Sequence, residues 1–202
     1  MIEKKQKGLI ANILDNFANI TEKDFVKGIM FVIVTAVLAS ATNYLTVSRG
    51  SLPNLAIRGI FQAILPAIAF FATLVGFGFS IGIYHTLSRL LGGQGEIRRM
   101  AALGGYASLP MLGQHALRFV YFFLINDPTD LTPIGSGVVR ILLNYFTIFS
   151  VTAIALTALA VKENYKVSGR RAIIIAFIPV LIPLVLAFLF RLQNIGLNPP
   201  LL

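Results

Sequence analysis

Apolar residues are gathered into five long runs along the chain, separated by short polar segments. The predicted transmembrane segments cover residues 26–44, 64–91, 101–125, 141–161 and 172–190. A helix of about 20 apolar residues spans the hydrocarbon core of a bilayer, at about 1.5 Å per residue. No carboxylate falls within any of these segments. The pattern therefore predicts an all-α integral membrane protein with five transmembrane helices.

The second apolar run is longer than one crossing requires, because it begins at residue 59. Its first residues are expected either at the outer interface or in the same, tilted helix. Proline lacks the N–H that a helix interior needs, so each proline within a run is expected to kink its helix. These prolines are Pro66, Pro110, Pro179 and Pro183.

Residues 8–20 show a different pattern, that of an amphipathic helix. Apolar residues recur at helical spacing and polar residues occupy the other faces. The apolar positions are Leu9, Ile10, Ile13, Leu14, Phe17 and Ile20. With lysines nearby, the pattern favours an N-terminal amphipathic helix that lies on the cytoplasmic leaflet. The alternative is a helix packed against the floor of the bundle or against a partner.

Composition and charge support a membrane protein with one domain. Hydrophobic residues make up 56% of the chain and charged residues 12%, whereas about a quarter of the residues of a soluble domain are charged. Five spans in 202 residues leave little chain for a soluble module, so residues 1–202 are expected to form a single membrane domain. The formal charge of +9 is expected to attract anionic lipids rather than nucleic acid.

The basic residues predict the topology. Twelve of them lie at or before the start of the first span and around the second and fourth gaps: Lys4, Lys5, Lys7, Lys23, Lys27, Arg89, Arg98, Arg99, Lys162, Lys166, Arg170 and Arg171. Four lie on the other side: Arg49, Arg58, Arg140 and Arg191. The positive-inside rule then places the N-terminus in the cytoplasm. With five spans, the C-terminus lies outside.

Small and polar residues form stripes that predict helix contacts. Small residues let helices approach closely in lipid, and they recur at Gly78 and Gly82 in the second run and at Ala101 and Gly105 in the third. A polar stripe follows the fourth run and includes Asn144, Thr147, Ser150 and Thr157. We expect this stripe either to pack helices or to line a polar cavity.

Candidate chemistry is scarce. The two histidines, His85 and His115, lie on different spans with no carboxylate nearby, so the sequence predicts no metal site, no catalytic residue and no cofactor. The absence of cysteine excludes disulfides and thiolate catalysis. Arg118 follows His115 by about one turn. It is expected either to snorkel to the outer headgroups or to form an anion or lipid site within the bundle.

The segment from Leu87 to Pro110 resembles the Yip1 family, and in particular its compact prokaryotic branch. A Gly-Gly turn, a short basic segment and a Gly-Tyr-Ala-Ser-x-Pro helix start carry the resemblance: Gly92, Gly93, Gly105, Tyr106, Ala107, Ser108 and Pro110. The resemblance implies a five-span fold with a cytoplasmic N-terminus, in a prokaryotic cell membrane. Eukaryotic relatives are associated with membrane trafficking, small prenylated GTPases and membrane shaping. Their Asp-Leu-Tyr-Gly-Pro motif does not occur here.

The functional hypothesis is a non-enzymatic membrane scaffold that binds anionic lipids, other membrane proteins or further copies of itself. It is expected to act as an accessory subunit of a larger complex or as a membrane-organisation or trafficking-like factor. The candidate binding residues are Arg89, Gly92, Gly93, Arg98, Arg99, Tyr106 and Arg118. The alternative is a small channel or transporter for an uncharged or anionic solute, with the polar stripe as its path.

Overall fold

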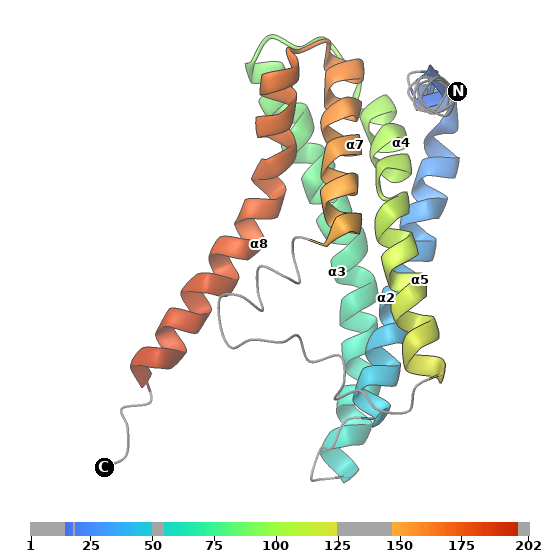
Figure 1. Cartoon of the computed structure of the whole chain (residues 1–202), viewed down its shortest axis with the longest axis vertical. Helices are drawn as coiled ribbons and strands as arrows, with labels where there is room; N and C mark the ends of the chain where they lie inside the picture. The colour runs from blue at the N-terminus through green and yellow to red at the C-terminus, as the bar shows by residue number, and fades with distance from the viewer. Residues whose placement is uncertain (1–14, 18, 50–54, 125–146, 198–202) are drawn as a thin grey trace, which may run out of the picture.

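The computed structural model describes residues 15–17, 19–49, 55–124 and 147–197, and this part of the chain is helical with no strand (Figure 1). A short 3-10 helix, η1 (Glu22–Asp24), comes before the first long helix. The helices are α2 (Phe25–Arg49), α3 (Leu55–Leu90), α4 (Ile97–Ala107), α5 (Leu109–Leu124), α7 (Ile148–Tyr165) and α8 (Gly169–Leu197). The all-helical prediction is confirmed for these residues.

Three of the described helices are long and apolar enough to cross a bilayer. The candidate spans are Glu22–Leu45, Gly59–Leu90 and Gly169–Leu186. On α3, the side chains of Phe71, Val75 and Phe79 are 63%, 68% and 60% exposed. Apolar exposure on this scale suits a surface that faces lipid, whereas in water it would favour aggregation. Helix α3 also continues unbroken through Pro66, so its first residues belong to the same helix as the rest of the second run.

The predicted segment 101–125 is not one helix. It begins earlier, at Ile97, and is divided at Ser108 into α4 and α5, which follow one another along the bundle (Figure 1). Pro110 explains the break, because it has no N–H for the carbonyl of Tyr106 and its ring crowds that carbonyl. Ser108 completes the end of α4, since its N–H donates to the carbonyl of Gly104 at 3.0 Å. The expected kink at Pro110 is therefore accompanied by a break of one residue at Ser108, whose backbone stays in the right-handed helical region.

The last two predicted segments also differ in their bounds from the helices observed. Helix α7 begins at Ile148, and residues 141–146 of the predicted segment lie outside the described residues. Helix α8 contains Pro179 and Pro183 and leans away from the other helices towards its C-terminal end (Figure 1).

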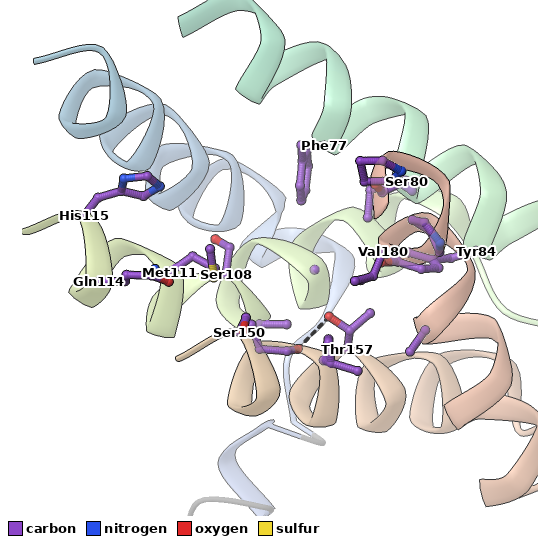
Figure 2. Close-up of a pocket in the computed structure, with 18 of the residues that line it drawn as sticks. Phe77, Ser80, Tyr84, Ser108, Met111, Gln114, His115, Ser150, Thr157 and Val180 are labelled. Atoms are coloured by element: carbon purple, nitrogen blue, oxygen red, sulfur yellow. Dashed lines mark hydrogen bonds between the residues drawn. The ribbon is translucent and has the colours of Figure 1, made fainter. Parts of the chain in front are cut away.

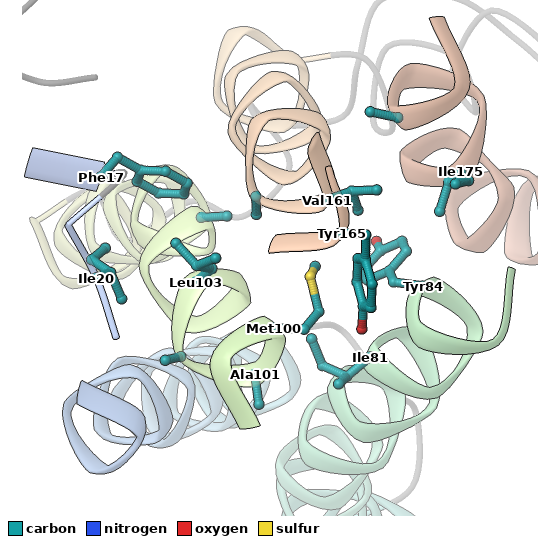
Figure 3. Close-up of a cluster of buried hydrophobic side chains, with 14 of the residues drawn as sticks. Phe17, Ile20, Ile81, Tyr84, Met100, Ala101, Leu103, Val161, Tyr165 and Ile175 are labelled. Atoms are coloured by element: carbon teal, nitrogen blue, oxygen red, sulfur yellow. The ribbon is translucent and has the colours of Figure 1, made fainter. Parts of the chain in front are cut away.

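Helix α4 forms the centre of the hydrophobic core. Met100, Ala102 and Leu103 are fully buried, and they pack with Ile81 of α3 and Val161 of α7 (Figure 3). Seven of the eleven residues of α4 are buried, and most are alanine or glycine. Small side chains let neighbouring backbones approach closely, which is the main source of helix contact in lipid.

The closest helix approach joins α2 and α4 through glycine. A Cβ on Gly28 would lie 2.6 Å from the carbonyl oxygen of Ala102, and a Cβ on Gly105 would collide with the backbone of Gly28. The predicted contact through Gly105 is thus present. The prediction for Gly78 and Gly82 is wrong within the described chain, because a Cβ at either position would meet open space.

The described end of the predicted amphipathic helix packs on the bundle. Phe17 and Ile20 are 7% and 8% exposed and belong to the core cluster around α4. The carbonyl of Ile20 also accepts a hydrogen bond from Nε of Arg99 at 3.1 Å. For these residues the structure favours packing against the bundle floor. Leu9, Ile10, Ile13 and Leu14 lie outside the described residues.

Candidate functional site

A cavity of about 430 Å³ lies between α3, α5, α7 and α8, with the end of α4 as part of its wall (Figure 2). This volume is within the range of small-molecule binding sites, roughly 300–1,000 Å³. Its polar lining residues are Ser80, Tyr84, Ser108, Gln114, His115, Arg118, Ser150 and Thr157. Its apolar lining comes from Phe77, Ile81, Gly104, Ala107, Met111, Ala153, Ile154, Ala176, Pro179, Val180 and Pro183.

One face of α5 supplies the most polar part of the wall. Met111, Gln114, His115 and Arg118 all line the cavity, and their spacing of three and four residues places them on one side of a helix. Gln114 is only 6% exposed, and its Oε1 accepts a hydrogen bond from Oγ1 of Thr147 at 3.2 Å. Gln114 was not among the residues predicted from the sequence, although its spacing from His115 and Arg118 places it on this face.

His115 and Arg118 face the cavity without the partners that such groups usually have. Nδ1 of His115 is buried and makes no hydrogen bond to the described part of the protein. Arg118 is the one cation in the lining, and none of the lining residues is a carboxylate. A buried polar atom without a partner costs free energy unless something else binds it. The cavity wall therefore carries a positive charge with no counter-charge in its lining, and Nδ1 of His115 is buried in that wall.

Several hydroxyls in the wall are already engaged by their own helices. Oγ of Ser80 donates to the carbonyl of Gly76, Oγ of Ser108 to that of Gly105, and Oγ1 of Thr157 to that of Ala153, at 2.8, 2.6 and 2.8 Å. Each of these hydroxyls already donates its hydrogen, so it can only accept a hydrogen bond from a ligand. The wall is consequently more apolar than its composition suggests, except near Gln114, His115 and Arg118.

The polar stripe of the fourth predicted span has two structural roles. Thr147 is the N-cap of α7, since its Oγ1 accepts a hydrogen bond from the N–H of Ser150 at 3.2 Å, and it also contacts Gln114 of α5. Ser150 and Thr157 line the cavity. Packing and cavity lining therefore both occur along this stripe. Asn144 lies outside the described residues.

A second region of interest is the turn that contains the Gly-Gly pair. The N–H of Gly92 donates to the carbonyl of Arg89 at 3.0 Å, and that of Gly93 to the carbonyl of Ser88 at 2.8 Å. Gly92 has a φ of 87°, which glycine adopts readily and other residues do not. This pair of bonds around a left-handed glycine is the Schellman motif that ends many helices. Gly92 and Gly93 thus terminate α3.

The α3–α4 loop is tied to the end of α7, and we call this joined region the loop clasp (residues 91–96 and 164–168). Nδ2 of Asn164 donates to the carbonyl of Glu96 at 2.8 Å, and Oδ1 of Asn164 accepts from the N–H of Glu96 at 3.4 Å. A Cβ on Gly95 would collide with the carbonyl of Asn164. The N–H of Gln94 also donates to the carbonyl of Tyr165 at 3.3 Å.

Two further contacts strengthen the clasp. The guanidinium of Arg171 donates to the carbonyl of Leu91 at 3.2 Å. The hydroxyl of Tyr165 lies 2.8 Å from Nδ1 of His85, within hydrogen-bonding distance. Tyr165 lies beyond the predicted span, and burial raises the pKa of its phenol to about 12, so it remains protonated at neutral pH. His85 is therefore a hydrogen-bonding group at the end of α3.

The structure divides the predicted binding residues among four places. Arg89 and Arg98 are exposed beside the clasp, and Gly93 is buried within it. Arg99 contacts the N-terminal segment. Tyr106 is half-buried, with its ring 5.1 Å from that of Phe31 in an edge-to-face arrangement. Arg118 lies apart from all of these, in the cavity.

A comparison with known families supplies one match, and the match covers most of the chain. The family model of the Yip1 domain matches residues 7–190. No curated protein and no solved structure matches the chain significantly. Among the described residues, no group of three or more histidine, aspartate or glutamate side chains could hold a metal ion.

Proposed function

Because the chain belongs to the Yip1 domain family and its helices suit a bilayer, we propose that this membrane protein is a non-enzymatic scaffold. It crosses the membrane five times, and the loop clasp with its surrounding basic residues forms its cytoplasmic face. This face binds anionic headgroups and a membrane-protein partner. The protein then serves as an accessory subunit or as a membrane-organising factor.

The arrangement of the helices supports this orientation. The start of α2, the α3–α4 loop and the α7–α8 loop all lie at one end of the molecule (Figure 1). That end holds nine of the described basic residues: Lys23, Lys27, Arg89, Arg98, Arg99, Lys162, Lys166, Arg170 and Arg171. Two of its acidic residues, Asp24 and Glu163, are paired with Lys27 and Lys166. The remaining excess of positive charge suits the anionic cytoplasmic leaflet.

The observation that carries the proposal is the clasp itself. Hydrogen bonds between Asn164 and Glu96, which are 68 residues apart in the sequence, hold the two loops in one fixed arrangement. Arg98 and Arg170 are exposed around it. A rigid surface costs less conformational entropy when a partner binds than a flexible loop of the same composition. The fixed arrangement of the clasp therefore favours a docking surface. Basic residues that only set the orientation in the membrane would not require it.

The test is gentle solubilisation from native membranes, followed by native electrophoresis and mass spectrometry of the complex. The wild type is compared with a double variant, Arg98→Gln with Arg170→Gln. The wild type is expected to migrate in a discrete larger complex with a stoichiometric partner. The double variant is expected to lose that partner and remain folded.

Arg118→Gln is the control, because it makes the same kind of substitution at the cavity rather than beside the clasp. It is expected to keep the protein partner. A wild-type protein that migrates as a monomer or homo-oligomer would contradict the scaffold proposal. So would a complex that the double variant leaves intact.

A channel or transporter for an uncharged or anionic solute is the second candidate, and the cavity is the observation that favours it. Ser150 and Thr157 line the cavity from α7. If they border a solute path, Ser150→Phe and Thr157→Phe should block flux into proteoliposomes and leave the complex assembled. If the scaffold proposal holds, the wild type shows no flux above that of empty liposomes.

A further inference from the structure

The charged side chain of the cavity, Arg118, lies at one of its ends together with the amide of Gln114. Helices α5 and α8 run away from the clasp, whereas α3 and α7 run towards it. Arg118 and Ser150 therefore lie at the end far from the clasp, and Tyr84, Thr157 and Ala176 lie at the end nearer to it. Phe77, Ile154 and Val180 form part of the apolar wall. The cavity is thus amphipathic along the direction of the bundle.

We propose that this cavity is a binding site for an anionic phospholipid of the outer leaflet. Arg118 pairs with the lipid phosphate. One acyl chain lies along the apolar wall of Phe77, Ile154 and Val180. The site is separate from the cytoplasmic face to which the scaffold proposal refers.

The charge of the site calls for an anionic ligand. Arg118 has no acidic neighbour among the lining residues, and the two ion pairs found in the described parts of the chain both lie near the clasp. A guanidinium inside a membrane bundle is costly without a counter-charge. Its planar fork of donors matches the oxygens of a phosphate.

The depth of Arg118 places it where a headgroup lies. With a rise of about 1.5 Å per residue, α4 and the part of α5 before Arg118 together extend roughly 30 Å from Ile97. This length matches the hydrocarbon thickness of a bilayer. If Ile97 lies at the cytoplasmic interface, Arg118 reaches the level of the outer phosphates. At this depth Arg118 contacts a lipid phosphate in either case, whether it snorkels to the headgroups or binds a lipid in the cavity.

The shape and lining of the cavity favour a lipid over a free anion. A site for a small anion is expected to surround it with donors, but here the hydroxyls of Ser80, Ser108 and Thr157 donate to their own helices. The rest of the wall is apolar, and the cavity volume of about 430 Å³ is far larger than a phosphate ion. A phospholipid fits both parts of the cavity, because its phosphate pairs with Arg118 and its acyl chain lies along the apolar wall.

The test measures lipid retention by native mass spectrometry. The purified full chain is equilibrated with mixed micelles that contain phosphatidylglycerol and phosphatidylcholine. The wild type is expected to retain one phosphatidylglycerol per chain in preference to phosphatidylcholine. Arg118→Gln is expected to lower this retention at least tenfold, and Arg118→Lys to restore part of it. The matched control, Lys27→Gln, removes a charge that is already paired with Asp24 and lies outside the cavity lining, and it is expected to retain the lipid like the wild type.

A second measurement uses the wild type alone, so it does not depend on how well a variant folds. Phosphatidylglycerol with a photoactivatable acyl chain is expected to cross-link to Ile154 or Val180, which line the cavity. Cross-links confined to Val75 and Phe79, which are exposed on the outer face of α3, would overturn the proposal. Equal lipid retention by Arg118→Gln and the wild type would also overturn it. Binding of inorganic phosphate without retention of phosphatidylglycerol would assign the site to a free anion instead.

Discussion

At the scale of single residues, Gly105 governs how closely α4 approaches α2. A Cβ at this position would collide with the backbone of Gly28, which cannot move without shifting a whole helix. We expect Gly105→Ala to lower the free energy of unfolding by about 1–3 kcal/mol, as overpacked sites do. Thermal unfolding in detergent, followed by circular dichroism, measures the effect. Gly78→Ala is the matched control, and an equal loss in both variants would contradict the assigned contact.

Thr147 is a second residue with a measurable role, because it caps α7 and contacts Gln114 of α5. Thr147→Val keeps the side-chain shape and removes both interactions. We expect a loss of about 1 kcal/mol in the free energy of unfolding, typical of a lost N-cap. Thr152→Val serves as the control, since the hydroxyl of Thr152 is exposed and donates only within its own helix, to Ile148 at 2.7 Å. Unchanged unfolding of Thr147→Val would refute the capping role.

At the scale of elements, the clasp depends on Asn164. Replacing it by leucine removes both hydrogen bonds between Asn164 and the backbone of Glu96. The N–H of Glu96 then loses its partner, whereas its carbonyl keeps the bond from the N–H of Met100 at 2.9 Å. We expect Asn164→Leu to increase hydrogen exchange in residues 91–96. Asn43→Leu is the control, because Nδ2 of Asn43 donates to Ala39 within α2. Exchange in this loop that stays as slow as in the wild type would show that other contacts hold the clasp.

The helices themselves were largely predictable from the sequence, and their contacts were not. Apolar runs located α2, α3 and α8 because each helix surface that faces lipid must be apolar along its length. The break at Ser108 was predictable only as a kink at Pro110. The clasp escaped prediction because Asn164 and Glu96 are far apart in the sequence, and a short polar loop shows no periodicity. Gly28 escaped for the same reason, since its contact with Gly105 depends on tertiary packing.

At the scale of the whole molecule, the charge pattern of the sequence predicted which loops share one end. The sequence predicted the residues of the cavity only in part. The clustering of basic residues in alternate gaps predicted that they would share one end, and the described loops do (Figure 1). His115, Arg118 and the polar stripe were noted separately. The sequence did not show that α5 and α7 bring Arg118, Ser150 and Thr157 to one cavity, because their meeting depends on how the helices are rotated about their axes.

Both proposals rest on one central claim, that the clasp end is cytoplasmic and the chain crosses the membrane five times. The sequence contains no cysteine, so single cysteines at Arg98, Arg170, Ser51 and Asp130 can be probed without background. Intact cells are treated with a membrane-impermeant maleimide. Cysteines at positions 51 and 130 are expected to react at once, and those at 98 and 170 only after permeabilisation. Reaction of 98 and 170 in intact cells, or the same behaviour for 51 and 98, would contradict the account.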